Sequence, residues 1–190
     1  KIVRKDDVPF YKGQMPIIFG NNAYIEPTKI EDYLAIGGYS ALVKVLSESS
    51  PEEVIEMIKR SGLRGRGGGG FPTGVKWESC RNAPGDKHYV ICNADEGDPG
   101  AYMDRGLLEG NPHSVLEGMM IGAYAIGSDE GYVYVRYEYP LAWEHVGIAI
   151  DQLRKCGLLG KDILGTGFDF DIKVSRGGGA FVCGESTALM

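Results

Sequence analysis

A glycine-rich segment has the residue types and spacing of a site that binds a phosphate-bearing or flat aromatic ligand. Residues 62–74 read GLRGRGGGGFPTG, and Lys76 and Trp77 follow almost at once. Glycine allows positive φ and a close approach of the backbone to a ligand, and backbone N–H groups beside the side chains of Arg64, Arg66 and Lys76 suit an anion. We therefore predict that this segment, called the glycine loop below, contacts a phosphate-bearing or extended planar cofactor.

The glycine loop contains a G-x-G-x-x-G match at Gly65, Gly67 and Gly70, which is a weak signal on its own. A Rossmann dinucleotide fingerprint also needs a strand before it and a helix after it. Residues 50–53, SPEE, instead form a capping box that predicts a helix leading into the loop, and the Phe-Pro pair after it does not open a helix in the usual way. A flexible glycine linker is the alternative, and the flanking aromatic and basic residues argue against it.

Polar residues also follow a predicted strand, at the position where open α/β sheets bind ligands. The apolar run at residues 89–92 is typical of a buried parallel strand, and Asn93, Asp95, Glu96 and Asp98 come after it. The same segment is rich in residues that favour turns. From the residues alone, a solvated acidic turn is therefore as good an interpretation as a ligand site.

The elements that must position these residues alternate between helix and strand. Apolar periodicity predicts helices at 51–61, 112–126 and 141–156 and strands at 89–93, 131–137 and 168–175. The last strand opens into a second glycine turn, RGGGA, at residues 176–180. Such alternation predicts an α/β domain with a mostly parallel sheet and right-handed crossovers. We place this domain at residues 48–190, after an arm of extended chain and short helices at residues 1–47.

Composition limits the classes of function. The formal net charge of −6 gives no basic surface for nucleic acid, and no run approaches the roughly 18–20 apolar residues of a membrane-spanning helix. A cytoplasmic protein is expected. The first residue is lysine, and the last residues read as the start of a helix, so the chain is predicted to be a fragment of a larger subunit, with segments missing on both sides.

Neither the cysteines nor the histidines form a recognisable metal or catalytic site. Cys80, Cys92, Cys156 and Cys183 contain no C-x-x-C pair, so no metal site is predicted in this chain and buried apolar roles are expected for the thiols. The three histidines are isolated in sequence, and structural or surface roles are expected for them. No Ser/His/Asp or Cys/His arrangement indicates a nucleophile or a general base.

Five motifs in order resemble one known family. They are the glycine loop, NADEGDPG at 93–100, Asp104-Arg105, NPH at 111–113 and RGGGAFVCGESTAL at 176–189. Together they look like the flavoprotein subunit of NADH dehydrogenase (respiratory complex I), which has relatives in soluble NAD(P)-linked hydrogenases and formate dehydrogenases. Motifs within residues 7–42 resemble the hydrogenase and formate dehydrogenase branch more closely. The resemblance implies a Rossmann-like FMN-binding α/β domain.

The resemblance also implies the cofactors FMN and NAD(H) or NADP(H), with the hydride chemistry carried by the flavin and no catalytic side chain. It implies that the cofactor-binding positions are Gly65, Arg66, Gly67, Gly68, Gly70, Phe71, Lys76, Asn93, Asp95, Glu96, Asp98, Phe181, Gly184, Glu185 and Ser186. In the family pattern Phe71 stacks near the nicotinamide and Lys76 reaches the flavin. A core anchor is the alternative for Phe71. Asn93 and Asp95 are expected to hydrogen-bond the flavin or its ribityl chain, and Glu96 is expected close to the nicotinamide.

The sequence departs from the family pattern at two positions. Ser186 stands where many relatives have a second glutamate near the adenosine ribose, so weaker discrimination against NADP(H) is predicted. Ser79 stands where relatives often have an aromatic residue, which puts adenine stacking at that position in doubt.

The resemblance implies a diaphorase module of a multisubunit NAD(P)-linked hydrogenase or formate dehydrogenase. The implied partners are a thioredoxin-like ferredoxin subunit and a larger iron–sulfur or catalytic subunit, with ferredoxin as a third reactant if electrons are bifurcated. Iron–sulfur clusters are expected only in these partners and in the C-terminal part of the subunit, and the groups that bind the FMN phosphate are expected beyond residue 190. The alternatives are the respiratory complex I subunit itself and a structural subunit that has lost its flavin.

Overall fold

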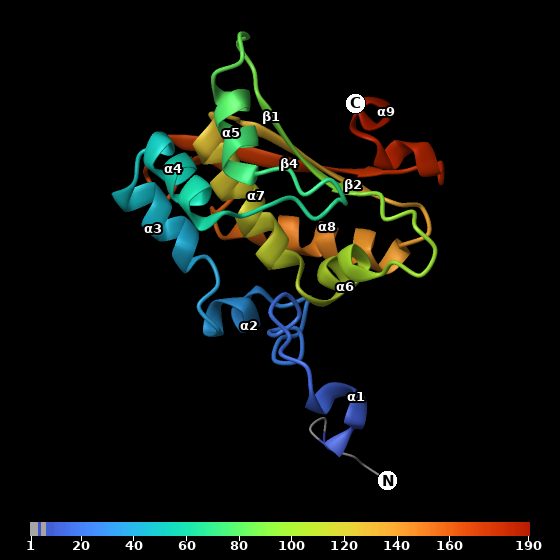
Figure 1. Ribbon diagram of the computed structural model, residues 1–190. Helices are drawn as coiled ribbons and strands as arrows, with labels where there is room; N and C mark the ends of the chain where they lie inside the picture. Colours follow the sequence, from blue (N-terminus) through green and yellow to red (C-terminus); the bar gives the residue numbers. More distant parts are fainter. Residues whose placement is uncertain (1–3, 5–6) are drawn as a thin grey trace.

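A mostly parallel sheet organises the fold. The computed structural model describes residue 4 and residues 7–190. Within that part of the chain the strands form a sheet in the order β1 (Tyr89–Ala94), β2 (Glu130–Val135), β4 (Phe168–Arg176) and β3 (Gly160–Ile163) (Figure 1). The β1–β2 and β2–β4 pairs are parallel, and β3 pairs antiparallel with β4. The predicted α/β class and mostly parallel sheet are therefore confirmed.

Two long helices cover one face of the sheet. They are α7 (Pro112–Ile126) and α8 (Pro140–Lys155). Alternate residues of the strands point into this layer, and the fully buried ones include Val133, Val135 and Ile172. Among the described residues no helix is both long enough and apolar enough to cross a membrane.

The helix before the glycine loop forms as its local signals predict. Helix α4 (Pro51–Ser61) begins with a capping box in which Glu53 N–H donates to Ser50 Oγ (3.3 Å) and Ser50 N–H donates to the Glu53 carboxylate (2.8 Å). It ends at Gly62, whose φ of 68° is the left-handed conformation that favours glycine.

One expectation about the glycine loop is wrong, because a helix does follow it. Helix α5 (Thr73–Arg81) begins directly after Pro72. Proline tolerates the start of a helix, since its fixed φ suits the first turn and the N–H that it lacks would have no partner there. The element before the loop is still a helix and not a strand, so the Rossmann fingerprint does not apply.

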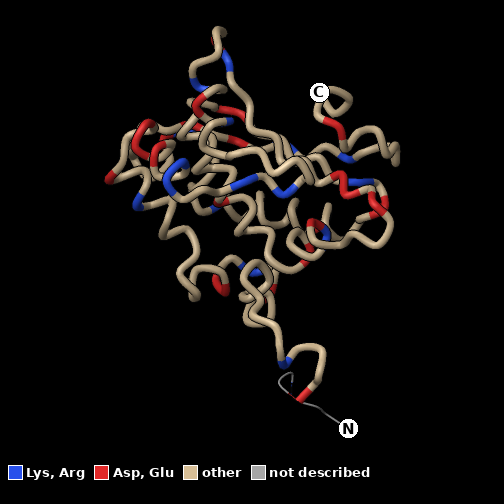
Figure 2. Tube along the Cα trace, in the orientation of Figure 1, with Lys and Arg blue, Asp and Glu red and all other residues tan. Residues whose placement is uncertain are grey.

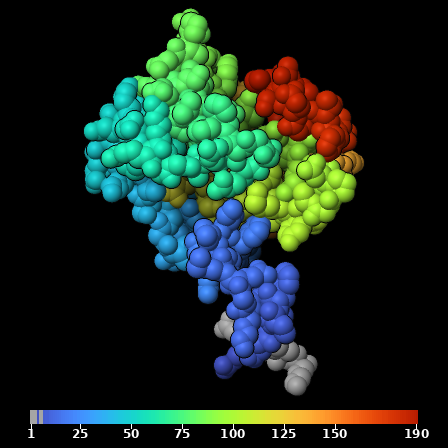
Figure 3. Space-filling model, in the orientation of Figure 1, coloured from blue at the N-terminus to red at the C-terminus, as the bar shows by residue number. Residues whose placement is uncertain are grey.

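The N-terminal region is irregular and helical, as expected. It contains α1 (Pro9–Lys12), α2 (Ile30–Ala35) and α3 (Ser40–Glu48). In the space-filling view the first part of this region extends away from the body of the molecule (Figure 3). Side chains of α2 and α3 nevertheless belong to the same apolar core as α7 and α8. The division of the chain at residues 47 and 48 stays a prediction.

A buried carboxylate joins this region to α7. Glu117, which is 7% exposed, accepts hydrogen bonds from Tyr33 OH (2.6 Å), Tyr39 N–H (3.0 Å) and Leu42 N–H (3.1 Å). Two of these donors belong to the N-terminal end of α3, so Glu117 caps that helix from another element. Burial, followed by the hydrogen bond to Glu117, raises the pKa of Tyr33, and the phenol remains a neutral donor.

The histidine of α7 extends the same polar network. His113 is 1% exposed, and its Nδ1 lies 2.8 Å from Tyr39 OH while its Nε2 lies 3.1 Å from Gln152 Oε1. Burial lowers the pKa of His113, which favours the neutral imidazole. A structural or surface role was expected for this residue, and the structure shows a buried structural one. Cys156 is exposed, against the expectation of a buried thiol.

Candidate cofactor site

The segments that follow β1 and β4 meet at the carboxyl end of the sheet. Asn93 Nδ2 donates to the carbonyl oxygen of Gly184 (2.9 Å), across 91 residues of sequence. Gly184 lies so close to the strand end that a Cβ there would stand 3.2 Å from the Asp95 carbonyl oxygen and 3.3 Å from Asp95 Oδ2. A Cβ on Gly97 would stand 2.5 Å from the ring of Phe181. Four of the predicted positions, Asn93, Asp95, Phe181 and Gly184, are therefore brought together.

Asp95 has an unusual environment at this junction. Its side chain is 2% exposed, and Oδ2 has no hydrogen-bond partner within the described part of the chain. Burial raises the pKa of Asp95, and the nearby guanidinium of Arg136 opposes that rise. Buried carboxylate oxygens in proteins are nearly always hydrogen-bonded, so an orphaned one indicates that a further donor belongs here.

The glycine loop is a narrow turn with an open tip. Arg64 and Pro72 form an antiparallel bridge, Gly65 N–H donates to Phe71 O (2.9 Å), and Arg64 Nη1 donates to Gly70 O (2.8 Å). Gly68 and Gly70 have positive φ, 100° and 59°. A Cβ built on any glycine from 67 to 70 would meet no atom within 4 Å. The backbone of the tip is therefore accessible to a ligand.

The base of the glycine loop is anchored more tightly than its tip. A Cβ on Gly74 would stand 2.6 Å from the backbone nitrogen of Lys59, which shows how closely α5 packs on α4. In the view of Figure 1 the loop extends toward the end of the sheet where β1 and β2 finish. Across residues 7–190 no hydrogen bond or ion pair connects the loop with Asn93, Asp95 or Gly184.

An open pocket lies beside the glycine loop. It is lined by Phe71, Lys76, Ser79, Cys80 and Ala83. Phe71 is 57% exposed, so a core anchor is the wrong description of its ring. Lys76 is exposed, and the described residues offer it no hydrogen bond or ion pair. An exposed aromatic face and an unpaired ammonium group can bind a flat ring and a negative charge respectively.

Comparison with known proteins assigns this arrangement to a family. Residues 58–190 match the family described as the Nuo51 FMN-binding domain. This chain belongs to the Nuo51 FMN-binding domain family.

Relatives of this Nuo51-family chain include components of several oxidoreductases. It is 56% identical over 179 residues to the NADP-reducing hydrogenase subunit HndC of Solidesulfovibrio fructosivorans, covering 94% of this chain and 36% of that protein. It is 52% identical over 161 residues to a subunit of the NADH-quinone oxidoreductase of Aquifex aeolicus, covering 85% of this chain and 37% of the relative. The chain therefore spans about a third of the length of these relatives.

A solved structure has the same fold. The crystal structure of an NAD⁺-reducing [NiFe]-hydrogenase in the air-oxidized state superimposes with a TM-score of 0.70 at 30% identity, covering 93% of this chain and 27% of that chain. The match extends beyond the family domain into the N-terminal region.

Two predicted contact residues of this Nuo51 domain hold helix ends. The Glu96 carboxylate accepts the N–H groups of Asp104 (2.9 Å) and Arg105 (3.2 Å) at the start of α6 (Met103–Gly110). Glu185 caps α9 (Ser186–Leu189) by accepting hydrogen bonds from the N–H groups of Thr187 (3.0 Å) and Ala188. These hydrogen bonds from the backbone lower the pKa of Glu185. The cofactor contacts expected of Glu96 and Glu185 stay predictions, as do those of Arg66, Asp98 and Ser186.

The residue that sequence reasoning missed is Arg136, directly after β2. Its Nη1 donates to the carbonyl oxygen of Glu96 (2.9 Å), its Nη2 lies 2.7 Å from Glu138 Oε1, and its Nε lies 3.9 Å from Asp95 Oδ1. The predicted strand at residues 131–137 includes Arg136, and β2 ends one residue before it, so neither a motif nor a strand-end position marked this arginine.

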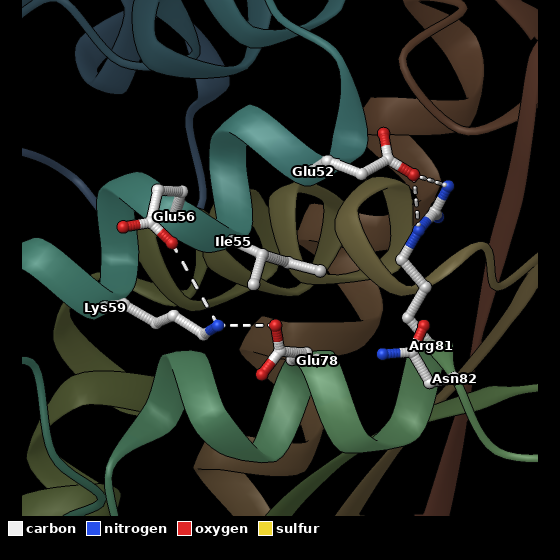
Figure 4. Close-up of a pocket in the computed structure, with 7 residues that line it drawn as sticks. All are labelled: Glu52, Ile55, Glu56, Lys59, Glu78, Arg81 and Asn82. Carbon is white, nitrogen blue, oxygen red and sulfur yellow. Dashed lines mark hydrogen bonds and ion pairs between the residues drawn. The ribbon is translucent and has the colours of Figure 1, made fainter.

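A second pocket, between α4 and α5, is polar and internally compensated (Figure 4). It is lined by Glu52, Ile55, Glu56, Lys59, Glu78, Arg81 and Asn82. Lys59 pairs with Glu78 (2.5 Å) and Arg81 pairs with Glu52 (2.6 Å) across it. Because these charges are paired with one another, we assign the pocket to the packing interface between the two helices.

Acidic and basic residues are interspersed along the chain as a whole (Figure 2).

Replacing Asp104 with asparagine is expected to stabilise the protein at high pH only. Burial, and then the carboxylate of Glu96, raises the pKa of Asp104 from 3.8 to about 6. The folded state therefore favours the protonated acid, and the stability that this contributes is complete below about pH 4 and is lost as the pH rises through about 6. In thermal unfolding of the full-length subunit, D104N should raise Tm by about 2–4 °C at pH 8 and leave it unchanged near pH 4. D86N, in the exposed turn before β1, is the matched control, and an equal shift of Tm in D104N at both pH values would contradict the assignment.

Proposed function

We propose that this chain is the FMN- and NAD(P)(H)-binding part of a diaphorase subunit, which transfers electrons from a nicotinamide nucleotide to iron–sulfur centres. The observation that carries the proposal is the junction of Asn93, Asp95 and Gly184, where a buried carboxylate oxygen is left without a donor among the described residues. Membership of a family defined by FMN binding supports the choice of ligand.

The residues at hand fit such a cofactor. Asp95 Oδ2 can accept a hydrogen bond from an N–H or hydroxyl group, and the open tip of the glycine loop lets a planar ligand lie against bare backbone. Lys76 supplies positive charge, and Phe71 supplies an exposed ring. When bound, FMN supplies hydride exchange with the nicotinamide and release of electrons one at a time. The protein supplies placement and charge balance.

We place the subunit in a larger assembly. The proposed partners are a thioredoxin-like ferredoxin subunit and a larger iron–sulfur or catalytic subunit, in the cytoplasm or at the periphery of a membrane. The relative in a NADP-reducing hydrogenase supports the NAD(P)-linked hydrogenase branch. A formate dehydrogenase, and bifurcation with ferredoxin, belong to the same proposal. The alternative is the complex I subunit, which the relative in an NADH-quinone oxidoreductase supports.

The deciding experiment is to measure FMN occupancy of the full-length subunit and its reduction by NADH and by NADPH separately. Bleaching of the flavin absorption band by either nucleotide is the expected result. Bound FMN that neither nucleotide reduces would point to a flavoprotein with another electron donor. A subunit that binds no FMN would leave the structural-subunit alternative standing.

Replacing Ser186 with glutamate is expected to weaken binding of NADPH about tenfold more than binding of NADH. A carboxylate at this position would accept hydrogen bonds from ribose hydroxyl groups and repel a 2′-phosphate, whereas serine carries no charge. The two dissociation constants should be measured for the wild type, for S186E and for S186Q, which adds length without charge. Equal losses for both nucleotides in S186E would contradict this role.

A further inference from the structure

Arg136 connects the strand end that carries the junction with the next strand along the sheet. Its side chain is 14% exposed, and it leaves β2 at the carboxyl end of the sheet, between β1 and β4. The guanidinium donates through Nη1 to the carbonyl oxygen of Glu96 (2.9 Å), which also accepts from Tyr139 OH (3.1 Å). Two side chains of the β2–α8 connection thus hold one backbone oxygen of the turn after β1.

The same guanidinium is the cation nearest to Asp95 among the described residues. Its Nε lies 3.9 Å from Asp95 Oδ1, so the two charges attract without a direct hydrogen bond. The carboxylate of Glu138 accepts hydrogen bonds from the same guanidinium, from Nε (3.2 Å) and from Nη2 (2.7 Å). Glu138 therefore orients Arg136, and across residues 7–190 its carboxylate makes no hydrogen bond to residues 95–97.

The backbone of the turn is shaped for this approach. A Cβ on Gly97 would stand 3.0 Å from Arg136 Nη1 and 2.5 Å from the Phe181 ring. Glycine at this position lets the arginine and the phenylalanine both pack against the main chain. The orphaned Oδ2 of Asp95 lies on the side of Gly184, and no described donor makes a hydrogen bond to it.

We propose that Arg136 is a positioning residue for the cofactor, acting through Asp95: it fixes the turn at residues 95–97 and keeps the carboxylate charged, with Oδ2 free to accept a hydrogen bond from the bound flavin. The inference rests on the proposed function. The flavin contact belongs to Asp95, and the arginine determines where that contact lies and what charge it carries.

A double-mutant cycle on the full-length subunit tests this inference. FMN dissociation constants are measured by flavin fluorescence for the apo forms of the wild type, R136Q, D95N and the R136Q/D95N pair. Each single variant is expected to weaken binding at least tenfold. The pair should be no more than about threefold weaker than D95N alone, because the arginine acts through the aspartate. The proposal would be overturned if the loss of affinity in the double variant equalled the product of the losses in the two single variants. Wild-type affinity in R136Q would also overturn it.

Two further variants separate positioning from folding. R136K retains a cation and is expected to recover affinity to within about fivefold of the wild type. E138Q removes the charge of the arginine's other partner but keeps one acceptor oxygen for the guanidinium, and it should bind FMN to within about threefold of the wild type. Thermal unfolding of each apo form accompanies the titrations. If R136Q fails to fold, the FMN affinities of R136K and E138Q test the proposal in its place. Equal and large losses of FMN affinity in both variants would overturn the proposal. A wild-type subunit without FMN affinity would overturn the proposed function and this inference together, whereas FMN binding unaffected by R136Q overturns the inference alone.

Discussion

Valine in place of Gly67 is expected to leave the fold intact and to weaken FMN binding at least about 100-fold, or roughly 2.7 kcal/mol. Gly67 has an ordinary backbone conformation, and a Cβ there would meet no atom within 4 Å. The branched side chain would instead occupy the space directly above the backbone of the loop tip, where the proposed cofactor lies. Fluorescence titration of the apo subunit measures the affinity, and thermal unfolding measures the fold.

A glycine outside the loop provides the matched control for this result. Gly118, on the exposed side of α7, also has an ordinary conformation and open space around its Cβ direction. G118V is expected to change FMN affinity less than threefold and stability by less than about 1 kcal/mol. Wild-type affinity in G67V would remove the glycine loop from the cofactor site.

Loss of the Glu117 carboxylate is expected to destabilise the protein by about 3–5 kcal/mol. Alanine would leave the Tyr33 hydroxyl and the N–H groups of Tyr39 and Leu42 buried without an acceptor. Chemical denaturation of the full-length subunit gives the total loss. Hydrogen exchange should show that the amides of α3 lose protection first, since that helix loses its cap.

Glutamine is the informative comparison at the same site. E117Q keeps one carbonyl oxygen, which can accept from two of the three donors. The loss in free energy of unfolding should therefore be about half of that in E117A. E109A, which removes a surface pair with Arg105, should cost less than about 1 kcal/mol. If E117A lost no more stability than E109A, the buried network would not hold the N-terminal region.

Local signals account for the parts of the fold that the sequence predicted well. The capping box and the terminal glycine of α4 lie within the helix's own segment, and both form as expected. Strand β3 was missed because its four residues gain their conformation from pairing with β4. Helix α5 was missed because the proline before Thr73 was taken as a barrier, when it serves as the N-cap residue.

In the candidate site, too, the features set by neighbouring residues in the sequence were predicted, and the contacts between distant residues were not. A polar residue after an apolar strand marked Asn93 and Asp95, because carboxyl ends of parallel strands gather at one edge. Nothing near Arg136 in the sequence indicates that its partner is a carbonyl oxygen 40 residues earlier. The nucleotide contacts themselves depend on a ligand, so the roles of Phe71, Lys76 and Ser186 await the binding measurements.

The cap that Glu117 places on α3 also affects the order of events during synthesis. Its three donors precede it by 75–84 residues. At a typical rate of about 5–20 residues per second, the ribosome needs roughly 4–17 s to supply the missing acceptor after the donors have been made. During that interval α3 has an open N-terminus, and the apolar surfaces of Tyr33 and Leu42 lack the core residues of α7 and α8 with which they share one cluster. The N-terminal region of the nascent chain is therefore expected to be a chaperone substrate until α7 has emerged.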